Sequence, residues 1–327
     1  MKICIVGCGL IGEKRAKAAK KLGCDEFVFV DLNLSLAKKL AQNFNGGAFS
    51  EFQQALDKNL DIDAVIVATS HHALSDIGVI SLQNGIPTLI EKPGAVSLDE
   101  IYRIKDANNK NVPVSVGFNH RFHPSLLLIN DWVSQGKLGE LMYVRARYGH
   151  GGRIGYGSEW RCQREVSGGG QLIDQGAHLI DLALWYMGPL ALEYAYIPNL
   201  YWSESDVEDN CFVALKGSQK RFAWLHATWS EWKNTFSFEI SGKDVKMEVS
   251  GLGGSYGTET LKIYEMLPEM GPPKTTIYEY PFVDSSWELE LDNFFGAIYR
   301  NEKIVGDLDD CIKMHEIVHS AYQQNQK

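Results

Sequence analysis

The sequence lacks the features that would direct it to a membrane or to nucleic acid. No segment has the roughly 18 uninterrupted apolar residues of a transmembrane helix. Positive charge is not in excess, because 32 Lys and Arg residues are outnumbered by 41 Asp and Glu residues, which gives a net charge of -9. Such a chain offers no general footprint for nucleic acid or an anionic lipid surface, although a local basic pocket is compatible with it. We therefore expect neither a nucleic-acid partner nor a membrane partner.

Clustered cysteines are also lacking. The six cysteines are scattered, with no C-x-x-C pair, so the sequence predicts neither a zinc site nor a disulfide framework. The opening apolar run, MKICIV, is too short for the core of a signal peptide and is followed by glycines. We expect a cytoplasmic protein with reduced thiols, in which Cys4 and Cys8 are small buried residues of the first strand and of the turn after it.

The first 31 residues follow a strand, turn, helix, strand pattern. The apolar run KICIV leads into GCGLIG, which has G-x-G-x-x-G spacing, then helix-forming residues follow, and a second apolar run, FVFV, ends at Asp31. In a dinucleotide-binding fold the first glycine makes the turn, the second lets the backbone approach the pyrophosphate, and the third lets helix and strand pack closely. This context, rather than the glycines alone, predicts a Rossmann domain. The predicted cofactor contacts in the turn are Gly7, Gly9, Leu10, Ile11 and Gly12.

Asp31 indicates which dinucleotide binds. Its carboxylate can accept hydrogen bonds from a ribose 2'-hydroxyl and would repel a 2'-phosphate. The next two residues, Leu32 and Asn33, supply no arginine that could receive such a phosphate. We therefore add Asp31 to the cofactor site and expect NAD rather than NADP.

Two later strand ends carry polar residues. The buried run AVIVAT ends at Thr69 and is followed by His71 and His72, and the run TLIEK ends in Glu91 and Lys92. Ligands of open α/β sheets bind at the carboxyl ends of strands. We therefore assign four of these residues to the cofactor site: Thr69, His72, Glu91 and Lys92. A helix-capping or solvent-facing role is the alternative for His72.

Besides contacting the cofactor, Lys92 could act on the substrate. In a cleft it could hydrogen-bond a substrate hydroxyl, stabilise a developing alkoxide or act as a base, and at an open strand end it could simply be solvated. The sequence does not decide whether its peptide bond to Pro93 is cis.

The segment GGGQLIDQGAHLID, residues 168–181, places titratable side chains on an otherwise apolar helix. At helical spacing Asp174, His178 and Asp181 stack along one stripe, and the rest of the helix is apolar almost all round, which predicts that protein surrounds it. Buried titratable groups are costly unless they are paired or used. From this segment alone a structural Asp–His pair, a metal site and an acid/base site all remain open.

Five motifs occur in one order along the chain: GCGLIG, ATSHH, EKP at 91–93, GFNHRFHP at 117–124 and the glycine-led segment at 168–181. In that order and spacing the sequence resembles the family of glucose-fructose oxidoreductase and inositol dehydrogenase (Gfo/Idh/MocA). The resemblance extends to VEDNCFVAL at 207–215 and FAWLHATWS at 222–230, which look like sheet strands of the family. The EKP and Asp...His motifs are specific together, although neither is specific alone.

The resemblance implies an active site. Lys92, Asp174 and His178 look like the catalytic lysine, aspartate and histidine of the family, which transfers hydride without a metal. We therefore expect no metal site, and we expect the Asp174–His178 stripe to face the nicotinamide. Asp181 is expected to be mainly structural, with orientation of His178 as one role open to it.

The composition and the strand pattern predict an α/β protein of two domains. A Rossmann domain over residues 1–118 is followed by an α+β domain over residues 119–327, in which one helix, the strand LMYVRARYG and six further strand-like runs predict a large, mostly antiparallel sheet. All eight tryptophans lie beyond residue 118. Core packing is their default explanation, and a sugar-stacking surface or an oligomer interface is the alternative. We expect the sheet to join subunits into a homodimer or homotetramer, and helices over residues 287–324 to return to the first domain.

A glycine-rich loop over residues 149–170 carries Arg153, Arg161 and Arg164. Such loops often act as lids, and three arginines could clamp a carboxylate, phosphate or diphosphate; a solvated, mobile loop is the alternative. The arginines weakly favour a nucleotide sugar or an acidic sugar over a neutral cyclitol. The predicted substrate contacts are Asn119, Arg121, Arg153, Trp160, Arg161, Asp174 and His178.

Together these observations predict an NAD-dependent oxidoreductase that transfers a hydride between nicotinamide and a secondary alcohol of a sugar, nucleotide sugar or cyclitol. His178 would take the hydroxyl proton, Lys92 would polarise the same oxygen, and Asp174 would position the substrate or tune the pair. One alternative is a non-catalytic NAD-binding sensor or scaffold, which has no need of an acid/base constellation. The other is an enzyme that retains and recycles its NAD, as in sugar-sugar oxidoreduction or glycoside cleavage.

Overall fold

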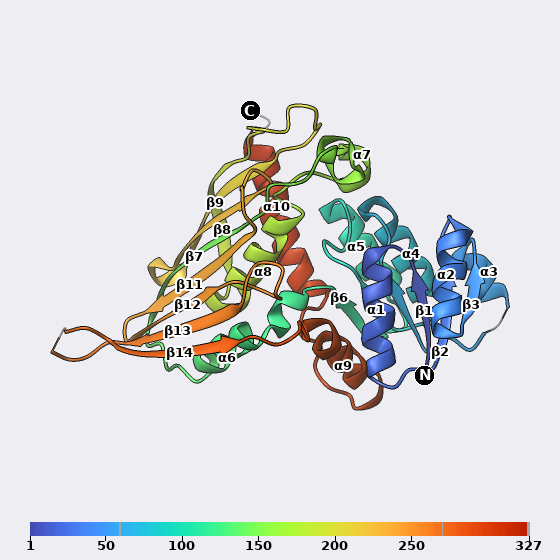
Figure 1. The fold of residues 1–327 in the computed structure, drawn as a ribbon, viewed down its shortest axis with the longest axis horizontal. Helices are drawn as coiled ribbons and strands as arrows, with labels where there is room; N and C mark the ends of the chain where they lie inside the picture. The colour runs from blue at the N-terminus through green and yellow to red at the C-terminus, as the bar shows by residue number, and fades with distance from the viewer. Residues whose placement is uncertain (59, 270, 326–327) are drawn as a thin grey trace. The chain divides into compact units, whose positions relative to one another are not determined.

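The structure, a computed structural model, describes residues 1–58, 60–269 and 271–325, and the chain divides into two compact units (Figure 1). The first unit comprises Met1–Asn119, Val166–Gly168 and Trp287–Ile312, and the second comprises His120–Glu165, Gly169–Ser286 and Lys313–Lys327. Each unit has a sheet of its own.

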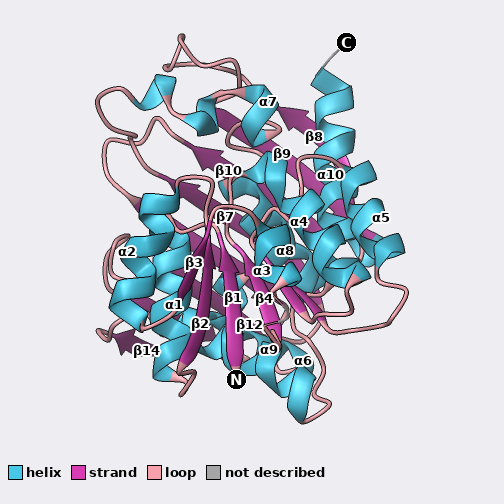
Figure 2. Cartoon of the chain, turned by 90° about the vertical axis from the view of Figure 1, so that its right-hand side faces the viewer, coloured by secondary structure: helices cyan, strands magenta, loops and turns pink. Residues whose placement is uncertain are grey.

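The first unit is built on six parallel strands in the order β3-β2-β1-β4-β5-β6, which Figure 2 draws in magenta. This is the strand order of a Rossmann fold, so the predicted dinucleotide-binding domain is confirmed. Every residue of β4 is buried, because helices cover both faces of a parallel sheet. The strands are β1 (Lys2–Val6), β2 (Glu26–Val30), β3 (Gly47–Phe49), β4 (Ala64–Val67), β5 (Thr88–Ile90) and β6 (Val114–Val116). The short strand β3 was missed by the sequence analysis.

Helices alternate with these strands along the chain. They are α1 (Leu10–Lys21), α2 (Leu34–Phe44), α3 (Phe52–Asp57), α4 (His71–Gln83) and α5 (Leu98–Ala107). Side-chain caps begin two of them, because Asn33 accepts a hydrogen bond from the Ser35 amide at α2, and Ser97 accepts one from the Glu100 amide at α5.

The C-terminal segment is helical, as predicted, and forms α9 (Ser286–Tyr299) and α10 (Leu308–Asn325). Leu291, Phe294 and Phe295 of α9 belong to the same hydrophobic core as residues of β1 and β2. The helix α9 is therefore part of the first unit, although it comes late in the sequence.

A buried arginine connects α9 to the rest of the first unit. Arg15 of α1 has no exposed surface and forms ion pairs with Glu91, which follows β5, and with Glu290 of α9. Its Nε atom lies 2.6 Å from Glu91 Oε1, and its guanidinium carbon lies 4.6 Å from the ring centre of Trp287. Burial by itself would lower the pKa of Arg15, but the carboxylates of Glu290 and Glu91 raise that pKa, so the arginine stays charged.

The second unit is built on eight strands in the order β14-β13-β12-β11-β7-β10-β9-β8. All neighbours are antiparallel except β7 and β10, so the predicted large, mostly antiparallel sheet is confirmed. The strands are β7 (Leu141–Gly149), β8 (Leu190–Tyr196), β9 (Asn210–Gly217), β10 (Phe222–Thr228), β11 (Thr235–Gly242), β12 (Val245–Ser250), β13 (Glu259–Glu265) and β14 (Lys274–Tyr280). The edge strand β14 was missed by the sequence analysis.

Helices cover one face of this sheet. The helix α8 (Gln175–Met187) packs against β7 and β10, and α6 (Pro124–Ser134) packs against β12, β13 and β14. The remaining helices are short: η1 (Asn119–Phe122), η2 (Tyr156–Ser158), η3 (Trp160–Cys162), α7 (Arg164–Ser167) and η4 (Ser218–Lys220).

Alternation along β7 separates the two faces of the sheet, because Val144, Ala146 and Tyr148 are buried whereas Arg145 and Arg147 are exposed. The exposed face, which we call the outer face, also carries large aromatic side chains. They are Tyr143, Tyr194, Tyr196, Phe222 and Trp224.

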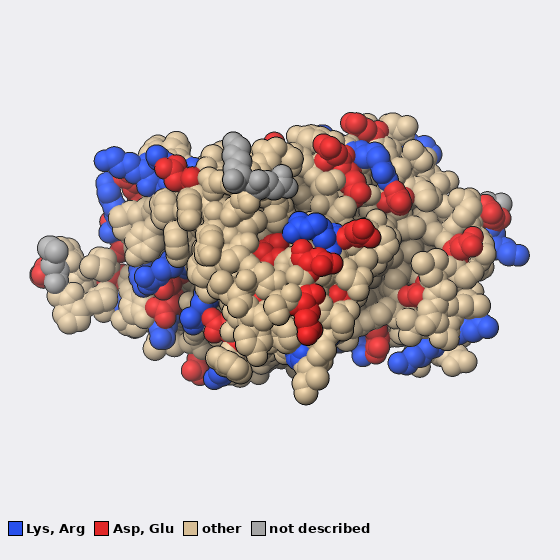
Figure 3. Space-filling view, turned by 90° about the horizontal axis from the view of Figure 1, so that it is seen from above, with Lys and Arg blue, Asp and Glu red and all other residues tan. Residues whose placement is uncertain are grey.

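Two further observations concern the helices and the surface charge. Among the described residues, no helix is both long enough and apolar enough to cross a membrane. On the face that Figure 3 shows, basic and acidic side chains are interspersed rather than gathered into one basic field. All six cysteines are free and buried.

The ion pairs of Arg15 lead to a first prediction. The substitution Glu290→Ala leaves a buried guanidinium with one carboxylate fewer, and we expect it to lower the free energy of unfolding by about 3 kcal/mol or more. Denaturation with urea measures this. The control is Asp309→Ala, which removes the partner of Lys105 from an exposed ion pair and should leave the unfolding midpoint almost unchanged. Equal stability of the two variants would show that Arg15 does not depend on Glu290.

Candidate active site

The glycine turn after β1 meets three different constraints. Gly7 has a φ of +97°, and a Cβ atom there would collide with the backbone of Ala68, just after β4. A Cβ atom at Gly12 would collide with the carbonyl group of Gly7. At Gly9, by contrast, a Cβ atom would meet nothing of the described chain within 4 Å. Folding therefore requires Gly7 and Gly12, whereas the bare backbone at Gly9 fits the close approach of a dinucleotide.

Asp31 holds this turn in place. The amide of Cys8 donates a hydrogen bond of 2.8 Å to Asp31 Oδ2, and the amide of Asn33 donates one of 2.8 Å to Oδ1. Each carboxylate oxygen has a further lone pair, so the side chain can still accept bonds from a ribose. Burial, followed by the charge of Asp31, raises the pKa of the Cys8 thiol to about 12, which fits an unreactive buried cysteine.

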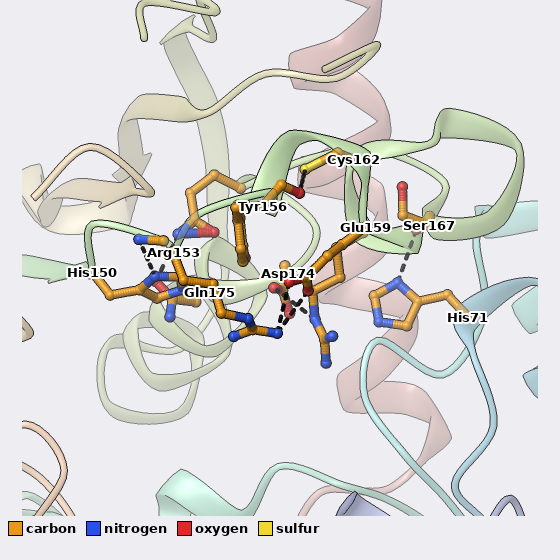
Figure 4. A network of polar contacts seen from close by, with 12 residues as sticks. His71, His150, Arg153, Tyr156, Glu159, Cys162, Ser167, Asp174 and Gln175 are labelled. Atoms are coloured by element: carbon orange, nitrogen blue, oxygen red, sulfur yellow. Dashed lines mark hydrogen bonds and ion pairs between the residues drawn. The ribbon is translucent and has the colours of Figure 1, made fainter. Parts of the chain in front are cut away.

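The two histidines after β4 have different environments. The buried His71 places Nδ1 at 2.9 Å from the carbonyl oxygen of Ser167, a contact that Figure 4 shows. His72 is exposed, and its Nδ1 lies 3.2 Å from the Ser70 hydroxyl. Both lie in the first turn of α4, and only His72 has a side chain at the surface. The Thr69 hydroxyl beside them donates to the Ser70 carbonyl.

The two charged residues of the EKP motif differ in burial. The carboxylate of Glu91 is buried against Arg15, so a cofactor contact at this position would fall to its backbone. Lys92 is half-buried at the carboxyl end of β5, and its peptide bond to Pro93 is cis.

The sequence analysis assumed that Asp174 lies inside the helix, but in the second unit this residue precedes the helix. The helix α8 begins at Gln175, and Asp174 is its N-cap residue. The helix stripe therefore consists of His178 and Asp181, both buried. A carboxylate at this end also faces the positive end of the helix dipole.

Glu208 holds the glycine turn that leads into α8. Its Oε1 atom accepts hydrogen bonds from the amides of Gly170 and Leu172, at 3.0 and 3.2 Å, and from the Tyr322 hydroxyl at 2.8 Å. A Cβ atom at Gly170 would collide with the Glu208 carbonyl. Glycine at this position therefore follows from close packing, and the packing fixes the turn that leads to Asp174 and to the start of α8 at Gln175.

Arg121, which the sequence analysis assigned to the substrate, is held by an ion pair inside the second unit. It is buried and forms a bidentate pair with Asp181, with Nε 2.9 Å from Oδ2 and Nη2 2.6 Å from Oδ1. Its guanidinium also lies 5.1 Å from the ring centre of Trp185. Asp181, which we expected to be mainly structural, is the carboxylate of this pair. Asn119, the first residue of η1, is buried.

His120, which the sequence analysis did not single out, lies beside His178. Its imidazole stacks on that of His178, with ring centres 3.7 Å apart and planes 16° apart. Tyr148 of β7 lies 5.3 Å from His120, measured between ring centres. From the NHR sequence we predicted substrate contacts at Asn119 and Arg121, the two neighbours of His120. The position of His120 beside His178 depends on how η1 folds, which the sequence did not reveal.

The three loop arginines are held by different partners. Arg153 pairs with Glu159 at 2.8 Å, as Figure 4 shows, and Arg164 donates to the Asp206 carbonyl at 3.4 Å. Only Arg161 is paired with Asp174, with Nε 3.7 Å from Oδ2. Its guanidinium also lies 4.4 Å from the ring centre of Trp160. This arrangement argues against a joint clamp for a diphosphate.

Tyrosines and a histidine surround Asp174. Burial, reinforced by the charge of Asp174, raises the pKa values of Tyr148 and Tyr156. Burial lowers the pKa of His150, and the charge of Asp174 partly offsets this effect. Among the residues that the structure describes, no group of three histidine, cysteine or carboxylate side chains is arranged to hold a metal ion. The arrangement supplies a carboxylate, an imidazole and neutral hydroxyls, which suit the binding and deprotonation of an alcohol.

Two family models match the chain. The oxidoreductase family model with an NAD-binding Rossmann fold matches residues 1–118, and the GFO/IDH/MocA C-terminal domain model matches residues 126–255. Together they cover more than half of the chain. The chain belongs to the GFO/IDH/MocA family. The Rossmann domain of this family member is NAD-binding.

Relatives of known activity resemble the chain to different extents. Levoglucosan dehydrogenase of Pseudarthrobacter phenanthrenivorans is 29% identical over 49% of this chain and 42% of its own length. D-glucoside 3-dehydrogenase of Escherichia coli is 22% identical over 99% of this chain and 95% of its own length. The first alignment therefore spans less than half of that relative.

Solved structures share the fold over the full chain. The complex of levoglucosan dehydrogenase with NADH has a TM-score of 0.86 at 21% identity, covering 99% of this chain and 97% of that one. The WlbA dehydrogenase of Bordetella pertussis, in complex with NADH and UDP-GlcNAcA, has a TM-score of 0.83 at 20% identity, covering 100% and 97%. At these identities the likeness concerns the fold.

The different constraints on the glycines of this family member can be tested. We expect Gly9→Ala to fold with wild-type stability and to bind NADH at least tenfold more weakly, because its methyl group points into space that a dinucleotide would use. Gly12→Ala should lower the melting temperature, because its methyl group collides with the Gly7 carbonyl. Fluorescence titration of NADH and thermal denaturation measure the two effects. Unchanged NADH affinity of Gly9→Ala would contradict this assignment of the turn.

Proposed function

We propose that this protein is an NAD-dependent dehydrogenase that oxidises a secondary alcohol of a sugar, sugar derivative or cyclitol, and that it also carries out the reverse reduction. The observation that carries the proposal is the start of α8, where Asp174 occupies the N-cap position and the buried His178 lies one turn later, stacked on His120. An oxidoreductase that only sensed NAD would have no use for a carboxylate and an imidazole held in this way.

The proposed roles follow from the chemistry of each side chain. His178 takes the proton of the substrate hydroxyl, because an imidazole can accept a proton near neutral pH. Lys92 donates a hydrogen bond to the same oxygen and stabilises the negative charge that develops there. Asp174 accepts a hydrogen bond from a neighbouring substrate hydroxyl, and Arg161 and Trp160 complete its surroundings. Bound NAD supplies the hydride acceptor.

The proposed cofactor site uses the first unit's loops. Gly7, Gly9 and Gly12 let the pyrophosphate approach the backbone and the start of α1, with Leu10 and Ile11 at the same turn. Asp31 binds the ribose hydroxyls and disfavours the 2'-phosphate of NADP. Thr69, His72 and the backbone of Glu91 are proposed as further contacts.

A hydroxyl-rich substrate without a strongly acidic group fits the second unit best. Arg153 and Arg164 are committed to other residues, and Arg161 is neutralised in part by Asp174. The names of two relatives, levoglucosan dehydrogenase and D-glucoside 3-dehydrogenase, refer to sugar substrates of this kind. We therefore place neutral sugars ahead of nucleotide sugars among the candidates, which reverses the weak preference drawn from the arginines in the sequence.

The proposed activity is tested by following NADH formation with NAD and a panel of sugars, glycosides, inositols and nucleotide sugars. We expect His178→Ala and Lys92→Ala each to lower kcat/KM by about a hundredfold to ten-thousandfold, while NADH affinity is retained. The controls are His319→Ala and Lys110→Ala, which change exposed residues of the same types. Turnover that survives in both His178→Ala and Lys92→Ala would refute the assigned roles. Tight NAD binding without any turnover would favour a sensor.

We also propose that the outer face of the second sheet joins subunits into a homodimer or homotetramer. Large exposed aromatic side chains such as Tyr143, Tyr196 and Trp224 support this, because apolar surface of this extent commonly marks an interface.

Light scattering tests the proposed assembly. We expect the wild-type mass to be a multiple of the chain mass, and Trp224→Glu to shift the protein towards the monomer, because a carboxylate buried in an interface is costly. Lys110→Glu, which changes a residue of the first unit, serves as control. A wild-type protein that is monomeric at all concentrations would refute the proposal.

A further inference from the structure

Tyr256 lies on a hairpin loop whose backbone shape depends on glycine. The loop joins β12 to β13 and includes Gly251, Gly253, Gly254 and Gly257, all of which have positive φ angles. Residues other than glycine rarely adopt such angles, so the sequence GLGGSYG constrains the path of the loop. The side chain of Tyr256 is partly buried, whereas most of the loop around it is exposed.

The hydroxyl of Tyr256 receives a hydrogen bond from the first residue of α8. Gln175 Nε2 donates to Tyr256 Oη at 3.1 Å. The orientation of that amide follows from its other contact, because Gln171 Nε2 donates to Gln175 Oε1 at 2.6 Å. The amide group of Gln175 has only donors on its nitrogen, so the oxygen of Tyr256 must be the acceptor.

Tyr148 packs against the ring of Tyr256. Their ring centres are 4.9 Å apart, with the planes inclined by 61°. Burial raises the pKa of Tyr256, so its hydroxyl remains protonated at neutral pH.

The proton of Tyr256 is therefore not used in its bond with Gln175. The oxygen accepts the hydrogen bond of Gln175 and carries one proton, which it can only donate. Gln175 directly follows Asp174 in the chain, and the ring of Tyr148, against which Tyr256 packs, lies 6.3 Å from that of His178. The donor is thus oriented beside the residues that we propose to act on the substrate.

We propose that Tyr256 is a substrate-binding residue whose hydroxyl donates a hydrogen bond to an oxygen of the sugar next to the hydroxyl that is oxidised. Gln175 and Tyr148 are its positioning residues, because Gln175 donates to the Tyr256 oxygen and Tyr148 packs against the Tyr256 ring. This inference rests on the proposed dehydrogenase function and adds a specificity element to it. A substrate that lacks the acceptor oxygen would leave the donor unpaired, which disfavours that substrate.

The substitution Tyr256→Phe tests this, because it removes only the hydroxyl. We expect the KM of the sugar to rise about threefold to tenfold, as for the loss of one neutral hydrogen bond, with little change in kcat or in the KM of NAD. On a deoxy substrate that lacks the partner oxygen, wild type and Tyr256→Phe should have equal kcat/KM. Tyr278→Phe, which changes a partly exposed tyrosine of β14, is the matched control and should match the wild type.

A second variant separates positioning from a purely structural role. In Gln175→Glu the donor becomes an acceptor, so the carboxylate takes the proton of Tyr256 and competes with the substrate. We expect the KM of the sugar to rise although the Tyr256 hydroxyl is intact, whereas Gln175→Glu combined with Tyr256→Phe should be no worse than Tyr256→Phe alone. Circular dichroism and thermal denaturation confirm that each variant is folded.

The outcomes distinguish this inference from the function on which it rests. If the wild type oxidises a sugar and Tyr256→Phe has the same KM, or if no deoxy analogue abolishes the difference, the role of Tyr256 is wrong and the dehydrogenase function stands. A fall in kcat at unchanged KM would also overturn it, because it would place Tyr256 in the chemical step. Absence of turnover by the wild type on every sugar would overturn both.

Discussion

Each unit contains a buried arginine whose charge is neutralised by one or two carboxylates from distant parts of the chain. Arg15 is paired with Glu91 and Glu290, and Arg121 is paired with Asp181. A buried guanidinium without these partners would be strongly unfavourable, so the segments that carry the carboxylates are held where they are. In the first unit this fixes the strand end that carries Lys92, and in the second it fixes η1 against α8. The residues that we propose to act on the substrate are thereby positioned by buried ion pairs that take no part in the proposed reaction.

Support by neighbouring residues also explains the start of α8. Glu208 and Tyr322 hold the glycine turn, and the turn sets Asp174 at the positive end of the helix. Packing then brings His120 onto His178, and the hairpin after β12 brings Tyr256 onto Gln175. A carboxylate, an imidazole and an oriented hydroxyl donor are what an enzyme needs in order to select and deprotonate one alcohol among several.

The sequence analysis could not see which charged residues are paired in the interior. Glu91 and Arg121 stand beside motif residues and carry charge, so the sequence could not separate them from Lys92 and Asp174. The structure shows that both are buried in ion pairs. The same holds for Arg153 and Arg164, whose partners were invisible in the sequence. His120 and Tyr256 were missed for the opposite reason, because their significance lies in contacts with residues far along the chain. The glycine-rich setting of Tyr256 was the one local signal that could have drawn attention to it.

The sequence by itself determined the dinucleotide turn, Asp31 at the end of β2, the α/β alternation and the antiparallel sheet. These features depend on hydrophobic periodicity and on backbone angles that only glycine allows, and both are local properties of the chain. Tertiary structure alone decided which charged residues are paired in the interior, that Asp174 precedes α8 rather than lying within it, and which tyrosine hydroxyl lies beside Gln175. Those outcomes depend on burial and on hydrogen-bond partners that the folded chain brings together from separate segments, and no local pattern records them.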